Sequence, residues 1–232
     1  MQQMSIVVFS PASMHIKYTY YFNRIVIKNT LNINKEICVK KLALSKVFLL
    51  GLLASSYASA NVLTGVVGIG YGFGGDKLGE GVFVNGDSDD IKANEGISIF
   101  GGADLALPQD FLLRGTLGYK FDTIDASNGD ISFSRVPVEF TVFKSLSNHK
   151  LGAGFTYHTA VSYECNVSGI CSGEVEFDDA AGLVVQYEYA FAPGALGQIA
   201  VGAKYTNIEY EVSSTGETFD GSGFDIHLTV LF

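Results

Sequence analysis

Hydrophobic and polar positions alternate along most of the chain with a period of two residues. From residue 63 onward, eight runs place apolar side chains at every second position and small or polar side chains between them. The runs span residues 63–73, 97–107, 111–121, 135–142, 151–161, 181–189, 198–205 and 224–232. A period of two indicates β-strands with one apolar face, and a strand of about ten residues can cross a bilayer when tilted. The pattern predicts an all-β fold with eight strands.

The links between these runs are of two kinds, and the two kinds alternate. Short links rich in turn-forming residues lie at 108–110, 144–150 and 192–195. Longer polar links lie near 74–94, 122–131, 164–177 and 207–222. Tight turns at one rim and long loops at the other are typical of an eight-stranded antiparallel transmembrane up-and-down β-barrel, which we therefore predict.

The ends of the apolar faces carry aromatic rings. Tyr71, Phe73, Tyr119, Phe121, Tyr157 and Tyr205 lie at the ends next to the long links, and Phe111, Phe140, Tyr187, Tyr189 and Phe232 lie at the opposite ends. Two aromatic belts suit the two interfaces of a membrane. A soluble β-sandwich or lipocalin-like barrel would also alternate, but it has no reason to carry two belts.

Composition narrows the function classes further. The chain has 232 residues, 12 Tyr, 17 Phe and a formal net charge of −9. The aromatic content argues against disorder, and the negative charge argues against an electrostatic nucleic-acid binder. No nucleic acid is therefore expected among the partners.

A short apolar stretch near the N-terminus has the layout of a secretory signal peptide. It spans residues 47–54, follows Lys40, Lys41 and Lys46, and ends in the small residues Ala58-Ser59-Ala60. We interpret residues 39–60 as the signal peptide, cleaved after Ala60, and residues 61–232 as the barrel domain. Residues 1–38 fit neither part, and we interpret them as a mis-annotated N-terminal extension ahead of a start at Val39.

The last run ends the chain in a characteristic way. Residues 223–232 read Gly-Phe-Asp-Ile-His-Leu-Thr-Val-Leu-Phe, and the alternating apolar positions are Phe224, Ile226, Leu228, Val230 and Phe232. This ending resembles the signal that the assembly machinery of outer-membrane barrels reads. Together with the leader, the eight runs and the segment Ser-Arg-Val-Pro-Val-Glu at 134–139, the chain resembles the small outer-membrane β-barrel family, the OmpA/OmpX/OmpW-like group.

The resemblance implies a place and a role. It implies an integral, monomeric surface protein of the cell outer membrane, in contact with outer-membrane lipids and lipopolysaccharide and assembled by the barrel machinery. The expected role is non-enzymatic, without a cofactor, in envelope integrity or surface contacts. A narrow porin-like channel for ions or small apolar molecules is the alternative, and an envelope lipid enzyme is a third possibility.

Ionisable residues on the polar face predict a charge network inside the barrel. The inward positions hold Arg114, Lys120, Arg135 and Lys204 against Asp104, Glu139, Glu188 and Asp225. Balanced charges can neutralise each other in a lumen only wide enough for side chains to meet. A three-residue turn at 108–110 would place Asp104 opposite Arg114, although Arg114 could instead reach Glu188 or Glu139 across the lumen.

Two further expectations concern the long links. Cys165 and Cys171 would remain after export and form a plausible disulfide in an oxidising compartment. The long links are rich in Asp and Glu and contain only Lys77 and Lys92 as basic residues. Divalent cations could bridge such acidic loops to lipopolysaccharide phosphates.

Three motifs suggest chemistry but lack the context that the chemistry needs. Residues 70–75 match G-x-G-x-x-G, yet no helix start follows to hold a pyrophosphate. Residues 85–90 resemble the start of a calcium loop but lack the required Gly and Glu. The histidines of the barrel region, His149, His158 and His227, have no local Ser-His pattern, so we expect interior hydrogen bonds rather than catalysis or metal binding.

The leader interpretation predicts the N-terminus of the exported protein. Sequencing or intact-mass measurement of protein from the membrane fraction should give Asn61 as the first residue. An exported protein that still begins before residue 39 would contradict both the cleavage site and the proposed start.

Overall fold

The computed structural model describes residues 4–8, 63–195 and 197–232, and all of them belong to one compact unit. The leader residues, including Ala58 and Ala60, lie outside the described residues. Within the described residues no helix is long and apolar enough to cross a membrane.

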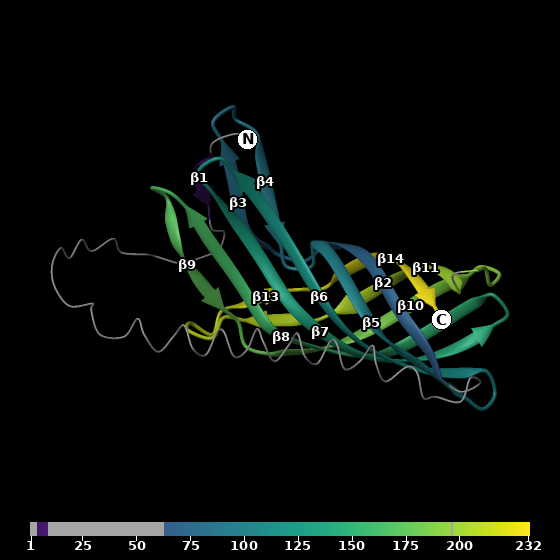
Figure 1. Cartoon of the computed structure of the whole chain (residues 1–232). Helices are drawn as coiled ribbons and strands as arrows, with labels where there is room; N and C mark the ends of the chain where they lie inside the picture. The colour runs from purple at the N-terminus through teal and green to yellow at the C-terminus, as the bar shows by residue number, and fades with distance from the viewer. Residues whose placement is uncertain (1–3, 9–62, 196) are drawn as a thin grey trace, which may run out of the picture. The chain divides into compact units, whose positions relative to one another are not determined.

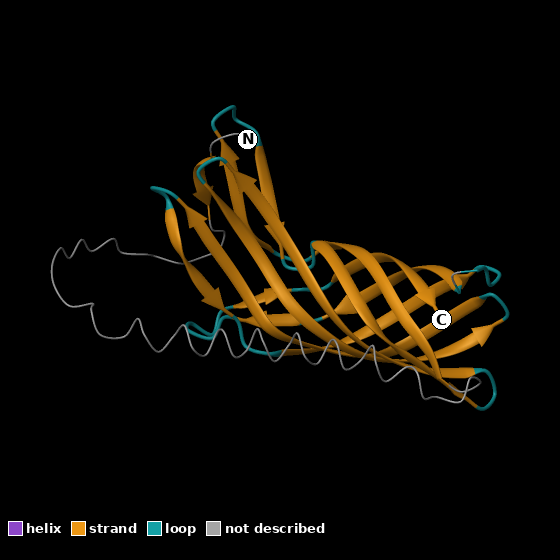
Figure 2. Cartoon of the chain, in the orientation of Figure 1, coloured by secondary structure: helices purple, strands orange, loops and turns teal. Residues whose placement is uncertain are grey.

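Eight antiparallel strands close into a barrel (Figures 1 and 2). They are β2 (Leu63–Gly74), β5 (Gly96–Leu107), β6 (Phe111–Ala126), β7 (Gly129–Leu146), β8 (His149–Val167), β10 (Ala180–Ala190), β11 (Gln198–Asn207) and β14 (Gly223–Leu231). Each strand pairs with its neighbour in this order, and β14 pairs with β2 to complete the circle. The predicted all-β, eight-stranded antiparallel barrel is confirmed.

The register between β5 and β6 follows from their turn. Leu107 pairs with Phe111, and Asp104 pairs with Arg114, as the three-residue link predicts. Gln109 and Asp110 adopt positive φ angles of 63° and 58°, so this tight turn uses the left-handed region twice. The link therefore fixes which side chains meet along the whole β5–β6 pair.

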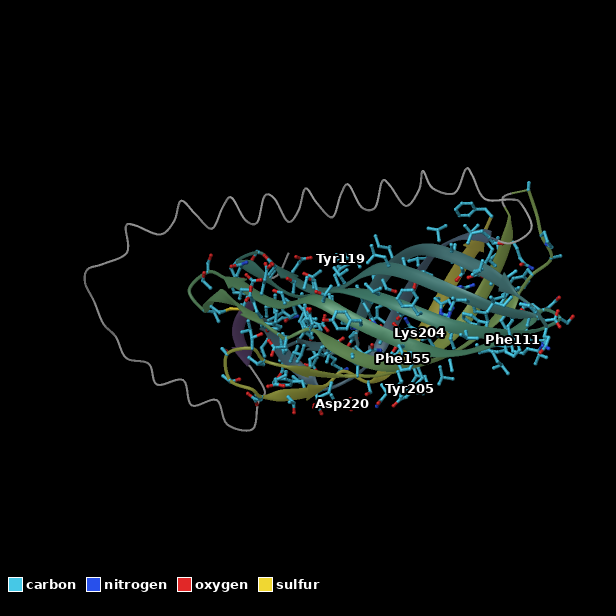
Figure 3. All side chains as sticks on the ribbon, turned by 90° about the horizontal axis from the view of Figure 1, so that it is seen from below. Phe111, Tyr119, Phe155, Lys204, Tyr205 and Asp220 are labelled. Atoms are coloured by element: carbon cyan, nitrogen blue, oxygen red, sulfur yellow. A yellow bond between two sulfur atoms is a disulfide. The ribbon has the colours of Figure 1, made fainter. Side chains whose placement is uncertain are left out.

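The outward face of the barrel is apolar. Large hydrophobic side chains are exposed on every barrel strand, including Ile69 on β2, Phe155 on β8 and Ile226 on β14. Figure 3 shows Phe111 toward the end with short turns and Asp220 toward the end with long links. We call these two ends the turn end and the loop end. The exposed apolar face is what the alternating pattern predicts for a barrel in lipid.

Two of the predicted long polar links are largely strand. Strands β6 and β7 stay paired up to Ala126 and Gly129, which leaves a two-residue turn instead of a loop over 122–131. The link near 164–177 contains the end of β8 and a return strand, β9 (Cys171–Glu176), that pairs with it. The prediction of loops was wrong here because polar residues on the outer side of these hairpins concealed their inward apolar positions.

The other long links also form hairpins. The first contains β3 (Lys77–Phe83) and β4 (Ser88–Lys92), and the last contains β12 (Glu209–Glu211) and β13 (Thr218–Asp220). An additional strand, β1 (Met4–Val8), pairs antiparallel with β3.

These hairpins share a hydrophobic core at the loop end, which we call the outer core. Its buried residues are Leu78, Ile91, Ala93, Ile124, Ala126, Ile131, Phe133, Val161, Tyr163, Cys165, Val167, Phe177, Ala180, Ile208, Tyr210 and Val212. Phe133 and Tyr210 meet edge to face with ring centroids 5.9 Å apart. The loop end is therefore a packed cap rather than a set of separate polar loops.

A bulge in β8 explains one wrong face assignment. The register between β7 and β8 shifts after Ser134, and Ala160 on β8 has a positive φ of 51°. One extra residue in a strand reverses which side chains face inward beyond it. Val161, predicted to share the outward face with Tyr157, is buried in the outer core instead.

A disulfide joins Cys165 and Cys171, whose Cα atoms lie 5.8 Å apart. Cys165 is part of the outer core, and Cys171 is the first residue of β9. The bond thus connects the two strands of the β8–β9 hairpin across its turn.

The reversal at Ala160 predicts opposite responses from adjacent positions. Val161→Asn should lower the free energy of unfolding by about 1–3 kcal/mol, because it places an amide in the outer core. Ala160→Asn should be nearly neutral, because Ala160 is exposed and Asn tolerates positive φ. Urea unfolding in detergent micelles measures the free energy of unfolding of both variants. A larger loss of stability from Ala160→Asn than from Val161→Asn would contradict the reversal.

Candidate functional site

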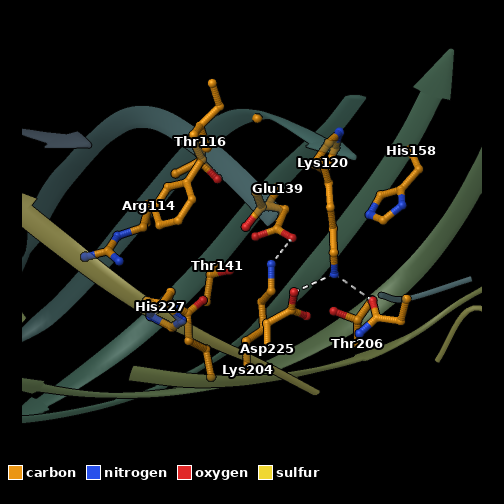
Figure 4. A pocket seen from close by; sticks show the side chains of 17 residues that line it. Arg114, Thr116, Lys120, Glu139, Thr141, His158, Lys204, Thr206, Asp225 and His227 are labelled. Carbon is orange, nitrogen blue, oxygen red and sulfur yellow. Dashed lines mark hydrogen bonds and ion pairs between the residues drawn. The ribbon is translucent and has the colours of Figure 1, made fainter. Parts of the chain in front are cut away.

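The polar interior of the barrel is the part of the structure that carries concentrated chemistry. Buried and partly buried ionisable side chains from β5, β6, β7, β8, β10, β11 and β14 point into it (Figure 4). They form two groups at different heights. We call them the turn-end cluster, which consists of Asp104, Arg114, Lys150, Gln186, Glu188 and His227, and the loop-end cluster, which consists of Asn94, Lys120, Arg135, Glu139, Lys204 and Asp225.

Arg114 is the centre of the turn-end cluster. Its Nε and Nη2 donate to the two carboxylate oxygens of Asp104, at 2.6 and 2.9 Å. Its Nη1 donates to Glu188 Oε1, on a strand across the lumen. The guanidinium also lies over the ring of Phe143, 4.8 Å from its centroid. Arg114 therefore binds two carboxylates. The sequence left open whether Arg114 would meet Asp104 or Glu188, and in the structure it contacts both.

Neutral and basic groups complete this cluster. Gln186 Nε2 donates to Glu188 Oε1 at 2.9 Å, and His227 Nε2 lies 3.2 Å from the same oxygen. Lys150 Nζ lies 3.8 Å from Asp104. Each carboxylate of the turn-end cluster thus faces at least one cation, as a low-dielectric lumen requires.

The loop-end cluster contains two ion pairs, the amide of Asn94 and one further cation, Arg135. Lys120 Nζ lies 2.5 Å from Asp225 and 3.0 Å from the amide oxygen of Asn94. Lys204 Nζ lies 2.6 Å from Glu139. Figure 4 shows both pairs, with Lys204 and Asp225 reaching inward from the last two barrel strands.

Arg135 lies where the loop-end cluster meets the outer core. It is fully buried, donates from Nη2 to the Glu95 carbonyl at 3.1 Å and lies over the Phe133 ring. Nearby, His158 Nδ1 lies 2.6 Å from the hydroxyl of Tyr210 in the cap. Burial raises the pKa of Tyr210 to about 12, so this hydroxyl stays protonated at neutral pH. These polar contacts connect the charges of the lumen to the packing of the cap.

Glycines on the inward face make room for these long side chains. A Cβ at Gly72 would lie 2.1 Å from Lys120 Nζ, and one at Gly68 would lie 2.2 Å from the Phe100 ring. Gly70 and Gly72, from the G-x-G-x-x-G match, therefore belong to the wall of a filled lumen. This agrees with the sequence analysis, in which the motif lacks the helix start that a pyrophosphate site needs.

Buried apolar side chains lie at both ends of the lumen. The outer core covers the loop end, and Val66, Ala190, Ala200 and Leu231 form a small buried apolar cluster at the turn end. Between them lies a cavity of about 40 Å³, lined by residues of both charge clusters. Since one water occupies about 10–15 Å³ of such volume, the space holds about three waters.

All eight predicted lumen residues face the interior, but they do not form one network. Asp104, Arg114 and Glu188 meet at the turn end, whereas Lys120, Arg135, Glu139, Lys204 and Asp225 gather at the loop end. Sequence reasoning missed Lys150, because it lay in a segment assigned to a turn. Lys150 lies two residues before the inward Gly152, so extending the alternation of β8 toward its start would have placed Lys150 inward.

The remaining sequence candidates lie elsewhere. The five apolar residues of the predicted assembly signal lie on or just after β14, with Phe224, Ile226 and Leu228 exposed on the outward face. Residues 85–90 form the β3–β4 turn and the start of β4. Within the described part of the chain, no group of three or more His, Cys, Asp or Glu side chains is arranged to hold a metal ion. Cation bridging between the acidic links and lipopolysaccharide stays a prediction.

Comparisons with known proteins were made for family, sequence and structure. No protein-family model matches the chain, and no curated protein matches it. Among solved structures it is similar to Neisserial surface protein A (NspA), with 14% identity and a TM-score of 0.43 over 73% of this chain and 97% of that one. It is also similar to Ail, the attachment invasion locus protein of Yersinia pestis, solved with the heparin analogue sucrose octasulfate, with 12% identity and a TM-score of 0.40 over 74% and 99%. Both TM-scores are below 0.5, so the fold assignment rests on the chain's own strand order and register.

The geometry around Arg114 predicts a graded mutational series. Asp104→Ala should lower the free energy of unfolding by about 3–5 kcal/mol, because it leaves buried cations without their partner. Asp104→Leu/Arg114→Leu should recover only part of this loss, since Glu188 then loses Arg114. Adding Glu188→Gln to that double variant should recover more.

The matched control is the exposed pair of Lys144 and Asp110, whose charged atoms are 3.7 Å apart. Asp110→Asn should cost less than about 1 kcal/mol, because water solvates both groups. Unfolding in micelles measures the whole series. A cost for Asp104→Ala no larger than that of the control would contradict the buried network.

Proposed function

We propose that this chain is an integral outer-membrane β-barrel protein with a closed lumen, whose packed cap provides a surface for contacts outside the cell. The observation that carries the proposal is the division of the barrel into an apolar outward face and a charged, internally paired interior. A soluble barrel would have the opposite arrangement, with its apolar face packed inside.

The outward face supports placement in lipid. Exposed aliphatic side chains cover the middle of the barrel strands, and exposed aromatic rings lie toward both ends, with Tyr71, Phe73 and Tyr119 at the loop end and Phe111 at the turn end. Aromatic rings at two depths match the two interfaces of a bilayer. The proposed surroundings are therefore outer-membrane lipids, with lipopolysaccharide around the loop end and the cap outside.

The interior favours a structural role over the channel alternative. A channel needs a continuous polar path, whereas here apolar clusters close both ends and ion pairs fill the space between them. Opening a path would require breaking contacts of Arg114 or Lys120, and a buried charge without its partner is costly. The paired charges thus act as a plug and stabilise the barrel.

The described contacts of the histidines support a non-enzymatic role. His149 contacts Tyr187, His158 contacts Tyr210, and His227 contacts Gln186 and Glu188. Among the described residues none of these partners is a serine or cysteine that the imidazole could activate as a nucleophile. The histidines hold neighbouring strands and the cap together, so the proposed function resides in the external surface.

The placement predicts which links are accessible on living cells. A short epitope inserted at Gly86, in the β3–β4 turn, should bind antibody on intact cells, because a side chain there would meet no atom within 4 Å. The same epitope at Gly194, in the link between β10 and β11, should bind antibody only after the outer membrane is permeabilised. Labelling of both insertions on intact cells, or of neither, would contradict the proposed orientation.

A further inference from the structure

The β8–β9 hairpin at the loop end carries a sequence pattern that the barrel and its charge network do not use (Figure 1). Asn166, Val167 and Ser168 form the only Asn-x-Ser/Thr segment in the 232 residues, and its middle residue is not proline. This is the acceptor pattern for N-linked glycosylation of exported proteins, which places a bulky, solubilising group on the surface. Because three residues carry little information alone, the geometry of the hairpin decides whether they can act as an acceptor.

The hairpin directs the polar groups of this pattern to solvent. Beyond its bulge, β8 alternates so that Cys165 and Val167 are buried in the outer core. Glu164, Asn166 and Ser168 lie on the opposite face and are exposed. A carboxylate, the acceptor amide and a hydroxyl therefore follow one another along one outward face, each two residues after the last.

The acceptor amide is not engaged by the folded cap. Among the described contacts, the side chain of Asn166 has no hydrogen-bond partner. By contrast, the amides of the exposed Asn85 and Asn207 donate to neighbouring side chains. Residues 166–172 also line an open hollow of about 440 Å³. A sugar attached to Asn166 would therefore break no described hydrogen bond of its side chain, and it has room beside the hairpin.

The backbone around the acceptor determines when it can be modified. In the folded cap Asn166 pairs with Asp130 on β7 and with Ser172 on β9, so it lies between two strands. The disulfide between Cys165 and Cys171 closes the turn around it. A transferase must bind the chain on both sides of the acceptor, and a strand paired on both sides does not allow this. The sugar must therefore be added during export, before the hairpin forms.

We propose that Asn166 is an N-glycosylation site, with Ser168 as its recognition hydroxyl and Glu164 as a charged contact for the transferase. The amide nitrogen of Asn166 forms a bond to the anomeric carbon of an oligosaccharide carried on a lipid pyrophosphate. The bond from that carbon to the pyrophosphate oxygen breaks, the lipid pyrophosphate leaves with the electron pair, and the amide gives one proton to a base of the transferase. The proposal goes beyond the proposed function and rests on the export that it includes.

The test uses the full chain, produced and exported in the bacterium that encodes it and purified from the outer-membrane fraction. Mass spectrometry of the intact protein, and of the peptide that contains residue 166, measures the glycosylated fraction and locates the attachment. The wild type should carry one glycan, attached through the side-chain nitrogen of Asn166. An intact disulfide between Cys165 and Cys171 in each variant shows that the hairpin has formed.

Four substitutions at exposed positions separate recognition from folding. Asn166→Gln and Ser168→Ala should each lower the glycosylated fraction about tenfold or more, because each removes a required group of the pattern. Ser168→Thr keeps the hydroxyl and should agree with the wild type within about twofold. The matched control is Asn85→Gln, which changes an equally exposed asparagine that has no hydroxyl two residues later, so the glycan should stay.

Two further variants test the charged contact and the order of events. Glu164→Gln should lower the glycosylated fraction, because it removes the carboxylate but keeps the acceptor pattern. Cys165→Ser/Cys171→Ser should keep or raise that fraction, because transfer precedes closure of the turn. A fraction unchanged by Glu164→Gln would contradict the charged contact, and a lower fraction without the disulfide would contradict the order.

The proposal is overturned if Asn166 of the exported wild type is unmodified, or if the glycan persists in Asn166→Gln or Ser168→Ala. A glycan that Asn85→Gln removes, or one attached to a serine or threonine, would overturn it as well. An unmodified Asn166 together with correct epitope exposure at Gly86 would reject only this proposal and leave the proposed function intact.

Discussion

The pairing of charges inside a space too narrow to hydrate them is the constraint on which the rest of the structure depends. Eight strands enclose room for side chains and little else. An Arg or Asp in that space must therefore meet a partner from another strand, or it destabilises the barrel. Arg114 meets this requirement with Asp104 beside it and Glu188 across the lumen. These contacts link strands that are far apart in the sequence and so help to set the register of the closed sheet.

The same constraint explains what surrounds the charges. Inward glycines such as Gly72 leave room for Lys120, and apolar clusters lie at both ends of the lumen, so only a few waters can reach the ion pairs. The cap is part of this arrangement, because Tyr210 of the outer core contacts His158 beside the loop-end cluster. Packing of the cap and charge pairing in the lumen therefore support each other.

Much of the barrel could be predicted from the sequence because the signal is local. Alternation identified the eight strands, and the turn after Leu107 was short enough to fix the pairing of Asp104 with Arg114. The inward positions of the eight charges followed from the same period. Local patterns could not predict how those charges group. The side chains that meet across the lumen are determined by the tilt and closure of the whole sheet.

The errors have the same origin. A single bulge at Ala160 reversed the faces of β8, and nothing in the neighbouring residues marks it. The outer core draws its residues from four hairpins, β3–β4, β6–β7, β8–β9 and β12–β13, and from the link before β10, each with too few apolar positions to predict a strand alone. Lys150 was missed because turn-forming neighbours concealed the first residues of β8. Long-range pairing, and not propensity, decided each of these features.

The central claim is that the lumen is closed by paired charges and apolar ends. Planar-bilayer recording of the exported protein in concentrated potassium chloride tests it most directly, with an outer-membrane porin as the positive control. The account predicts no discrete conductance steps from the wild-type barrel at moderate voltage. Reproducible single-channel steps that scale with protein concentration would show a continuous path through the barrel and contradict it.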